Sequence, residues 1–142
     1  MQVAGMQSRT LVCDRASMKV RCLVVDDNPG FLQTACWVLE REGISVVGVA
    51  STGSEALRRT RELRPDVALV DIDLGPESGF DVARQLTLDA DGTALTVILI
   101  STHAEQDFAD LIADSPAAAF VSKADLSAAA ILGVLRREDP DG

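Results

Sequence analysis

The sequence predicts an α/β protein built on a doubly wound parallel sheet. Strand-like apolar runs alternate with helix-like stretches along the chain, and such alternation is typical of a parallel sheet with helices on both faces. Two apolar runs end abruptly in acids, at Asp26-Asp27 and at Asp71. Because an unpaired buried carboxylate is costly, these acids are expected where the strands emerge, at the edge that binds ligands in open α/β sheets.

Five strands and five helices are expected, joined by short connections. The strands are placed near residues 20–25, 44–50, 67–71, 95–101 and 118–121. The helices are placed near residues 29–42, 53–64, 78–89, 104–114 and 124–137. The strand at 67–71 is apolar throughout up to its final acid, which predicts burial on both faces of the sheet.

Residues that favour helix ends mark several of these boundaries. Pro29 falls where a first-turn proline is tolerated, and Gly43 follows the end of the same helix. Thr52 or Ser54 is expected to cap the second helix, and Ser78 the third.

The length of 142 residues predicts one folded domain, at residues 19–137. Residues 1–18 lack clear periodicity and are expected to be a disordered tail or an upstream start. Residues 138–142 form a short polar tail, and no output domain is expected after it.

Composition excludes several classes of function. The net charge of −9 disfavours nucleic acid as a direct partner, because phosphate binding requires clustered Lys and Arg. No apolar run approaches the ~20 residues of a membrane span, and the amino terminus lacks a secretory pattern. A cytoplasmic protein is therefore expected. The three cysteines form no C-x-x-C pair and are expected to be buried free thiols without a redox or metal role.

Polar residues follow the other strands at the same expected edge. Asp73 lies two residues after Asp71, Ser101-Thr102 ends the fourth strand, and Ser122-Lys123 ends the fifth. Carboxylates ~4 Å apart repel by about 4 kcal/mol per pair at an effective dielectric of about 20. A divalent cation removes this repulsion, and a ligand set of oxygens favours Mg²⁺. With a lysine and a hydroxyl nearby, the set predicts phosphoryl transfer to an aspartate.

Four segments in order resemble the receiver domain of two-component response regulators. They are Leu23-Val-Val-Asp-Asp27, Pro65-Asp-Val-Ala-Leu-Val-Asp-Ile-Asp-Leu74 with Gly79, Val97-Ile-Leu-Ile-Ser101 and Ala119-Phe-Val-Ser-Lys123. The resemblance covers roughly residues 19–137. It implies a flavodoxin-like five-stranded parallel sheet in the order 2-1-3-4-5, with five helices.

The resemblance also implies roles for individual residues. Asp71 would be the phosphoacceptor, and Mg²⁺ would be held by Asp26, Asp27, Asp71 and the backbone carbonyl of Asp73. The residues that would bind the phosphoryl group and switch the conformation are Ser101, Thr102, Lys123 and Phe120. Asp73 and His103 would flank the attacking water and tune dephosphorylation.

The chain departs from the family pattern at three places. The loop after Asp71 reads Gly75-Pro-Glu-Ser-Gly79, where the family usually has Pro-Gly and an acid before the last glycine. Lys123 is followed by Ala124 and not by the usual proline. Thr102 stands where the family usually has Ala or Gly, so its bulk is expected to crowd the phosphoryl pocket.

Plainer interpretations stay open for some of these residues. The alternatives are a solvated loop acid for Asp73, a solvent-facing histidine for His103 and an ordinary core residue for Phe120. Trp37 points away from the apolar face of the first helix. It is either a docking anchor for the kinase or phosphotransferase or is covered by tail residues such as Leu11.

The leading functional hypothesis is a stand-alone receiver that is not an enzyme in its own right. It would accept phosphate from a histidine kinase or phosphotransferase and signal to a downstream protein. The face of the fourth helix, fifth strand and fifth helix is the expected surface of any homodimer. One alternative is a haloacid-dehalogenase-like phosphatase, although its paired acids follow the lysine whereas Asp26-Asp27 precede it. The other is a receiver-shaped interaction module that is never phosphorylated.

Overall fold

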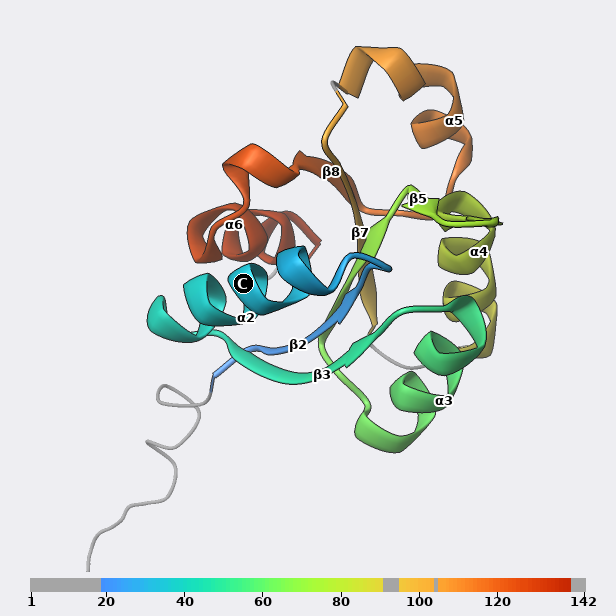
Figure 1. The fold of residues 1–142 in the computed structure, drawn as a ribbon. Coiled ribbons are helices and arrows are strands. Elements are labelled where there is room, and N and C mark those ends of the chain that lie inside the picture. The colour runs from blue at the N-terminus through green and yellow to red at the C-terminus, as the bar shows by residue number, and fades with distance from the viewer. Residues whose placement is uncertain (1–18, 91–94, 104, 139–142) are drawn as a thin grey trace, which may run out of the picture.

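A parallel sheet of five strands organises the computed structural model, which describes residues 19–90, 95–103 and 105–138 (Figure 1). The spatial order of the strands is β3-β2-β4-β7-β8. Their bounds are β2 Arg21–Val25, β3 Ser45–Ala50, β4 Val67–Asp71, β7 Thr96–Ser101 and β8 Ala119–Ser122. This order confirms the predicted 2-1-3-4-5 arrangement. The tails predicted at the two ends of the chain fall almost wholly outside the described residues.

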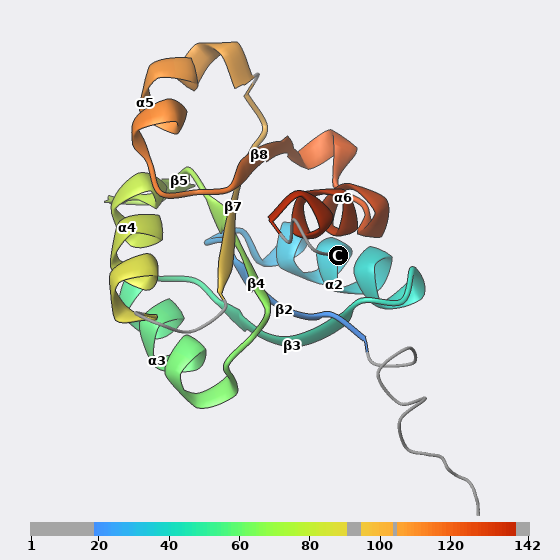
Figure 2. The same ribbon diagram turned by 180° about the vertical axis from the view of Figure 1, so that it is seen from behind.

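Helices cover both faces of the sheet (Figures 1 and 2). Helices α2 (Pro29–Arg41) and α6 (Ala128–Glu138) cover one face, and α3 (Gly53–Leu63), α4 (Gly79–Asp89) and the short α5 (Ala109–Asp114) lie on the other. Successive residues of a strand point to opposite faces. Cys22 and Val24 accordingly pack with Leu39 of α2 and Ile131 of α6. Leu23 and Val25 pack with the core residues of α3 and α4 instead.

Strand β4 is the centre of the sheet and is buried along its whole length. It pairs in parallel with β2 on one side and with β7 on the other. Its last residue, Asp71, is only 5% exposed. The buried apolar run therefore carries a carboxylate to the carboxyl edge of the sheet, as predicted.

The helix starts depend on the side chains that precede them. Asn28 accepts hydrogen bonds from the backbone N–H groups of Gly30 and Phe31 at the start of α2. Thr52 caps α3 and Ser78 caps α4, which confirms the caps predicted for both helices. Such caps satisfy backbone donors that have no partner within the helix.

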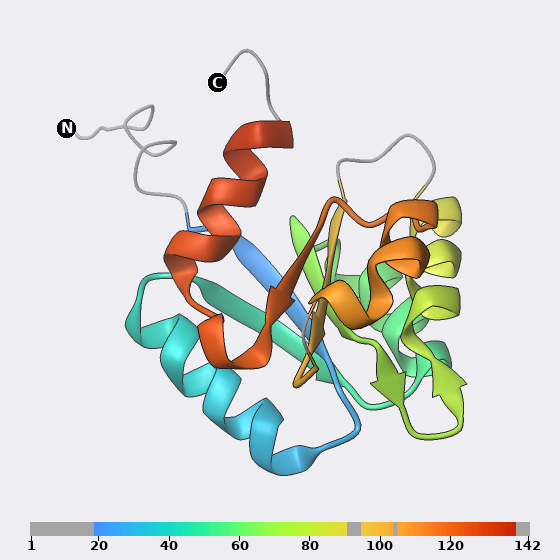
Figure 3. The ribbon, with the colours of Figure 1, turned by 90° about the horizontal axis from the view of Figure 1, so that it is seen from above.

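The structure contains a small hairpin that the sequence did not predict. Strands β5 (Asp73–Leu74) and β6 (Glu77–Ser78) pair in antiparallel fashion directly after Asp71. The turn between them has two residues and begins with Gly75, whose φ is +60°. Two-residue hairpin turns often require a positive φ at this position, which glycine adopts readily. The hairpin lies beside the first turn of α4 (Figure 3).

Two predicted helices are shorter than expected. The fourth is divided into a 3₁₀ turn, η1 (Glu105–Phe108), and the six-residue α5, which has no side-chain cap and no buried residue. The fifth is preceded by a separate 3₁₀ turn, η2 (Lys123–Asp125), and α6 begins only after Ser127, whose hydroxyl accepts from the Ala130 N–H. Each helix therefore starts later than expected: a 3₁₀ turn precedes both, and the Ser127 hydroxyl caps the start of α6.

No helix in the described part of the chain is long and apolar enough to cross a membrane. The two cysteines that the structure describes, Cys22 and Cys36, are both free. Burial, with a smaller contribution from Cys36, raises the pKa of the Cys22 thiol to about 12. Cys22 is therefore an inert core residue at neutral pH.

Candidate functional site

Three carboxylates meet at the carboxyl edge of the sheet. Asp26 and Asp27 follow the end of β2, and Asp71 ends the neighbouring strand β4. One oxygen from each lies within 4.8 Å of the others. Asp26 is fully buried, Asp71 is nearly so, and Asp27 is exposed. The cluster therefore has a buried side in the sheet and an open side toward solvent.

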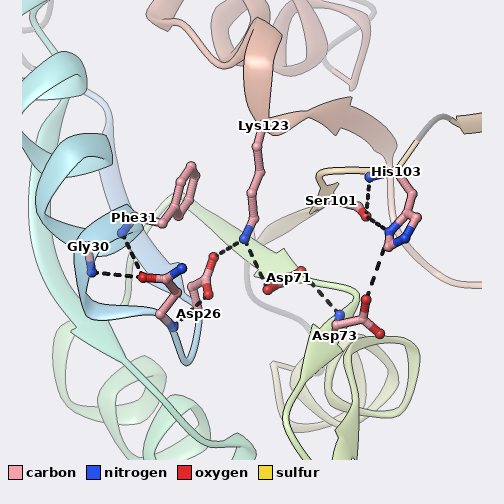
Figure 4. Close-up of polar contacts among 9 residues, drawn as sticks. Asp26, Gly30, Phe31, Asp71, Asp73, Ser101, His103 and Lys123 are labelled. Atoms are coloured by element: carbon pink, nitrogen blue, oxygen red, sulfur yellow. Dashed lines mark hydrogen bonds and ion pairs between the residues drawn. The ribbon is translucent and has the colours of Figure 1, made fainter.

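Lys123 joins two of these acids (Figure 4). It lies at the end of β8, and its Nζ is 2.5 Å from Oδ2 of Asp26 and 3.2 Å from Oδ2 of Asp71. The same ammonium lies 4.3 Å from the centre of the Phe31 ring, at the start of α2. A cation over an aromatic face is attracted to it, so Phe31 helps to hold the lysine over the acids.

Burial and neighbouring charges shift the pKa values of Asp71 and Lys123. Burial, reinforced by the charge of Asp26, raises the pKa of Asp71 to about 6, although the Asp73 N–H and Lys123 act against this rise. For Lys123, burial alone would lower the pKa, but its bonds and charge interactions with Asp26 and Asp71 raise it overall. The lysine is therefore charged wherever the carboxylates are ionised.

Asp73 and His103 lie beside the acid cluster. The backbone N–H of Asp73 donates to Oδ1 of Asp71 at 3.1 Å. The Asp73 side chain is 72% exposed and lies 4.0 Å from Nδ1 of His103. The His103 ring is also in an edge-to-face contact with Phe108 of η1. The pair predicted to flank the attacking water is thus close together at the open side of the site (Figure 4).

The other residues predicted for phosphoryl binding and switching are not hydrogen-bonded to Asp71 in the described part of the chain. Ser101 is 1% exposed, and its hydroxyl accepts from the His103 N–H at 3.0 Å, with no bond to Asp71. Thr102 is exposed, and Phe120 is half-buried against the core. In this state the Ser101 hydroxyl is therefore engaged by the histidine.

Trp37 lies on α2, with its side chain 61% exposed. The guanidinium of Arg41, one turn further along, lies 4.8 Å from the centre of its ring. The tail residues that would cover it on the alternative interpretation lie outside the described part of the chain. The predicted outward orientation of Trp37 is confirmed.

Sequence reasoning missed three residues that shape the site. No role at the site was predicted for Phe31, because its contact with Lys123 joins residues that are far apart in the sequence. Asn28 was not recognised as a cap, although an Asn before Pro is a usual helix start. Glu77 was noted only as a departure from the family loop, but its carboxylate accepts from the Gly53 N–H.

The donor set suits a hard divalent cation. The three side chains offer oxygen ligands only, and their closely spaced negative charges favour a cation among them. The cluster of Asp26, Asp27 and Asp71 is thus chemically suited to Mg²⁺.

A buried acid cluster and a lysine at the carboxyl edge of a flavodoxin-like sheet define the receiver class of signalling proteins. The response regulator receiver domain family matches residues 22–133. The chain therefore belongs to the receiver domain family of two-component response regulators.

Individual relatives agree with this assignment. The chain is 36% identical to protein PilH of Pseudomonas aeruginosa over 86 residues, which are 61% of this chain and 70% of PilH. It is 40% identical to the DNA-binding response regulator MtrA of Mycolicibacterium smegmatis, also over 61% of this chain. That match spans only 37% of MtrA, so the likeness concerns one part of that longer protein.

Solved structures have the same fold. The signal receiver domain of NarL from Mycobacterium tuberculosis superposes with a TM-score of 0.71 at 30% identity, over 82% of this chain and 97% of that one. A response regulator receiver domain protein from Clostridium thermocellum gives a TM-score of 0.70 at 29% identity, over 84% and 96% of the two chains. The predicted fold class and family are both confirmed.

Proposed function

We propose that Asp71 accepts a phosphoryl group from a phosphohistidine of a histidine kinase or phosphotransferase, in a reaction that requires Mg²⁺. The phosphorylated chain then signals by a change of conformation and by contact with a downstream protein. The observation that carries this proposal is the position of Lys123, whose ammonium contacts both Asp26 and Asp71. A charge placed there can pair with phosphoryl oxygens once the carboxylate is modified.

The chemistry requires few groups besides those already close together. An oxygen of the Asp71 carboxylate bonds to phosphorus while the bond from phosphorus to the donor imidazole nitrogen breaks. The electron pair of that bond remains on the nitrogen, and the product is an acyl phosphate. Mg²⁺ held by Asp26, Asp27, Asp71 and the carbonyl of Asp73 would supply positive charge for the phosphoryl oxygens. Lys123 supplies the other positive charge, and Phe31 keeps it in place.

The new charge would then change the surroundings of Asp71. A phosphoryl group adds roughly −1.5 to −2 charges and three acceptor oxygens, which would attract the Ser101 hydroxyl away from His103. Phe120 is half-buried beside this strand, so it can move as the hydroxyl turns. The affected surface is α5, β8 and α6, where Leu111 and Leu132 are exposed. We propose this surface for the downstream partner or for a homodimer.

The direct test uses acetyl phosphate as a small phosphodonor. With Mg²⁺, intact mass spectrometry is expected to detect one added phosphoryl group on the wild-type chain and none on Asp71→Asn. Peptide mapping after reduction of the acyl phosphate should locate the group at Asp71. Hydrolysis of p-nitrophenyl phosphate without a stable adduct would favour a phosphatase instead. A chain that gains no mass and hydrolyses nothing would be a receiver-shaped interaction module.

The lifetime of the acyl phosphate is expected to depend on Asp73 and His103. Their side chains lie 4.0 Å apart on the open side of the site, where water would approach the phosphorus. Asp73→Asn and His103→Ala should therefore change the dephosphorylation rate, measured by loss of the phosphorylated mass after the donor is removed. Two variants that both decay at the wild-type rate would rule out this role. Asp110→Asn, at an exposed position on α5, is the control.

A further inference from the structure

The β5–β6 hairpin forms a wall of the acid site. Its first residue, Asp73, donates its N–H to the Asp71 carboxylate at 3.1 Å. At its turn, a Cβ on Gly75 would lie 3.2 Å from Oδ2 of Asp27, so the backbone there is close to the second acid. The position of the hairpin therefore affects two of the three carboxylates and also the Asp73 carbonyl.

Glu77 attaches this hairpin to a different part of the fold. Both of its carboxylate oxygens accept from the N–H of Gly53, each at 3.1 Å. Gly53 is the first residue of α3, so the negative charge also lies at the positive end of that helix dipole. This contact thus joins the hairpin to the start of α3, through two residues that are 24 positions apart in the sequence.

The surroundings of Gly53 are fitted to this contact. A Cβ at that position would lie 2.5 Å from Oε1 of Glu77 and 2.9 Å from Cγ2 of Val82. Within the hairpin, Glu77 pairs with Leu74, whose side chain is 1% exposed in the core. One strand of the hairpin is therefore held by burial and the other by the Glu77 carboxylate.

We propose that Glu77 is a positioning residue for the Mg²⁺ and phosphoacceptor site. It touches neither the acids nor the lysine. By holding β6 against α3 it fixes the Gly75 turn beside Asp27 and the Asp73 backbone beside Asp71. This role rests on the proposed function, because it matters only if the three acids bind a cation.

A purely structural role makes a different prediction. If Glu77 only stabilised the start of α3, its loss would lower the melting temperature but leave the Mg²⁺ affinity of the folded chain unchanged. If it positions the hairpin, the affinity itself falls, because groups that orient metal ligands contribute about tenfold or more to binding. Mg²⁺ affinity measured well below the melting temperature therefore separates the two roles.

The experiment compares Mg²⁺ dissociation constants by isothermal titration calorimetry, with the Asp73 amide signal in ¹H–¹⁵N spectra as a second readout. Glu77→Ala is expected to weaken binding about tenfold and to shift the Asp73 signal before any Mg²⁺ is added. Glu77→Gln keeps an oxygen acceptor, so its affinity should lie between those of Glu77→Ala and the wild type. Glu62→Ala makes the same change of charge at an exposed position of α3 and should bind like the wild type.

A second variant approaches the contact from the other side. Gly53→Ala retains the Glu77 charge but displaces its carboxylate, and it should weaken Mg²⁺ binding as well. Gly133→Ala is its control, because a Cβ there meets nothing within 4 Å. Wild-type affinity in both Glu77→Ala and Gly53→Ala would overturn the positioning role and leave the proposed function intact. A wild-type chain that binds no Mg²⁺ would instead overturn the proposed function.

Discussion

At the scale of single residues, the site is a balance between two buried acids and one lysine. Asp26 and Asp71 are both withdrawn from water, and Lys123 contacts an oxygen of each. One positive charge compensates only part of the negative charge that Asp26, Asp27 and Asp71 carry together. Burial, reinforced by the charge of Asp26, keeps the pKa of Asp71 high. The uncompensated negative charge favours a cation in the cluster.

This balance predicts how stability depends on pH in the absence of Mg²⁺. Burial and the charge of Asp26 raise the pKa of Asp71 from 3.8 to about 6. Between these two values the folded chain binds more protons than the unfolded chain. The contribution of Asp71 is therefore fully present below about 4 and is lost as the pH rises through about 6.

Urea unfolding of Asp71→Asn checks the sign of this effect. The variant cannot ionise, so it should be more stable than the wild type above a pH of about 7. The difference should shrink as the pH falls toward 4. Asp110→Asn, at an exposed position, should follow the wild-type profile. A constant difference at every pH would contradict the assignment to Asp71.

Trp37 allows a separate test of partner docking. Its ring is 61% exposed beside Arg41, and buried tryptophans often dominate the energy of protein interfaces. Trp37→Ala is expected to slow phosphotransfer from the cognate kinase at least about fivefold. Uptake from acetyl phosphate should not change. Kinase transfer at the wild-type rate would show that the docking surface lies elsewhere.

Residue-level prediction from the sequence succeeded where the pattern is local and failed where contacts are distant. Asp26, Asp27, Asp71 and Lys123 all follow strand ends, so a parallel sheet brings them to one edge. The contact of Phe31 with Lys123 and that of Glu77 with Gly53 depend on how separate helices pack. No spacing in the sequence encodes either contact.

At the scale of elements, α4 has to start very close to the end of β4. A Cβ on Gly79 would lie 2.0 Å from the carbonyl oxygen of Asp71 and 2.6 Å from Cα of Ile72. Both neighbours are backbone atoms, so no side-chain movement can relieve the overlap. The glycine therefore allows the helix to approach the strand that carries Asp71.

A pair of glycine substitutions tests this close approach. Gly79→Ala should destabilise the fold by about 3 kcal/mol or more, as overpacking against fixed atoms does. Gly133→Ala in α6 meets no atom within 4 Å, and it should stabilise the protein by about 0.5–1 kcal/mol because alanine favours helix. Denaturant unfolding of both variants gives the comparison. Equal stability of the two would contradict the steric argument.

Element prediction was accurate for strongly patterned segments and poor for weak ones. The buried strand β4 and the caps Thr52 and Ser78 agree with the sequence analysis. The fourth helix is shorter than predicted because α5 has no side-chain cap and none of its residues is buried, so little holds a continuous helix there. The β5–β6 hairpin is too short for any periodicity to indicate it.

At the scale of the whole molecule, cation binding should stabilise the fold. A ligand that binds only the folded chain raises the free energy of unfolding by about 2.7 kcal/mol at 100 times its dissociation constant. Mg²⁺ is expected to have this effect on the wild type, as measured by urea unfolding with and without the metal. Asp27→Asn removes one ligand of the cluster and should reduce the gain. An identical gain in that variant would mean that Mg²⁺ binds elsewhere.

The strand order of the whole sheet was predicted, but how firmly each helix is attached was not. The order follows from the family resemblance carried by segments at four strand ends. A helix is held against the sheet by the side chains that it buries. Helix α4 buries five residues, whereas α5 buries none. Helix α5, which is part of the surface proposed for signalling, is therefore less firmly anchored than α4.

The outward position of Trp37 also has a practical consequence for spectroscopy. Because it is the single tryptophan of the chain and is already largely in water, its emission should change little when the protein denatures. The same fluorophore should respond strongly when another molecule covers α2. Optical titration can therefore count bound partners directly, while loss of structure has to be followed by circular dichroism.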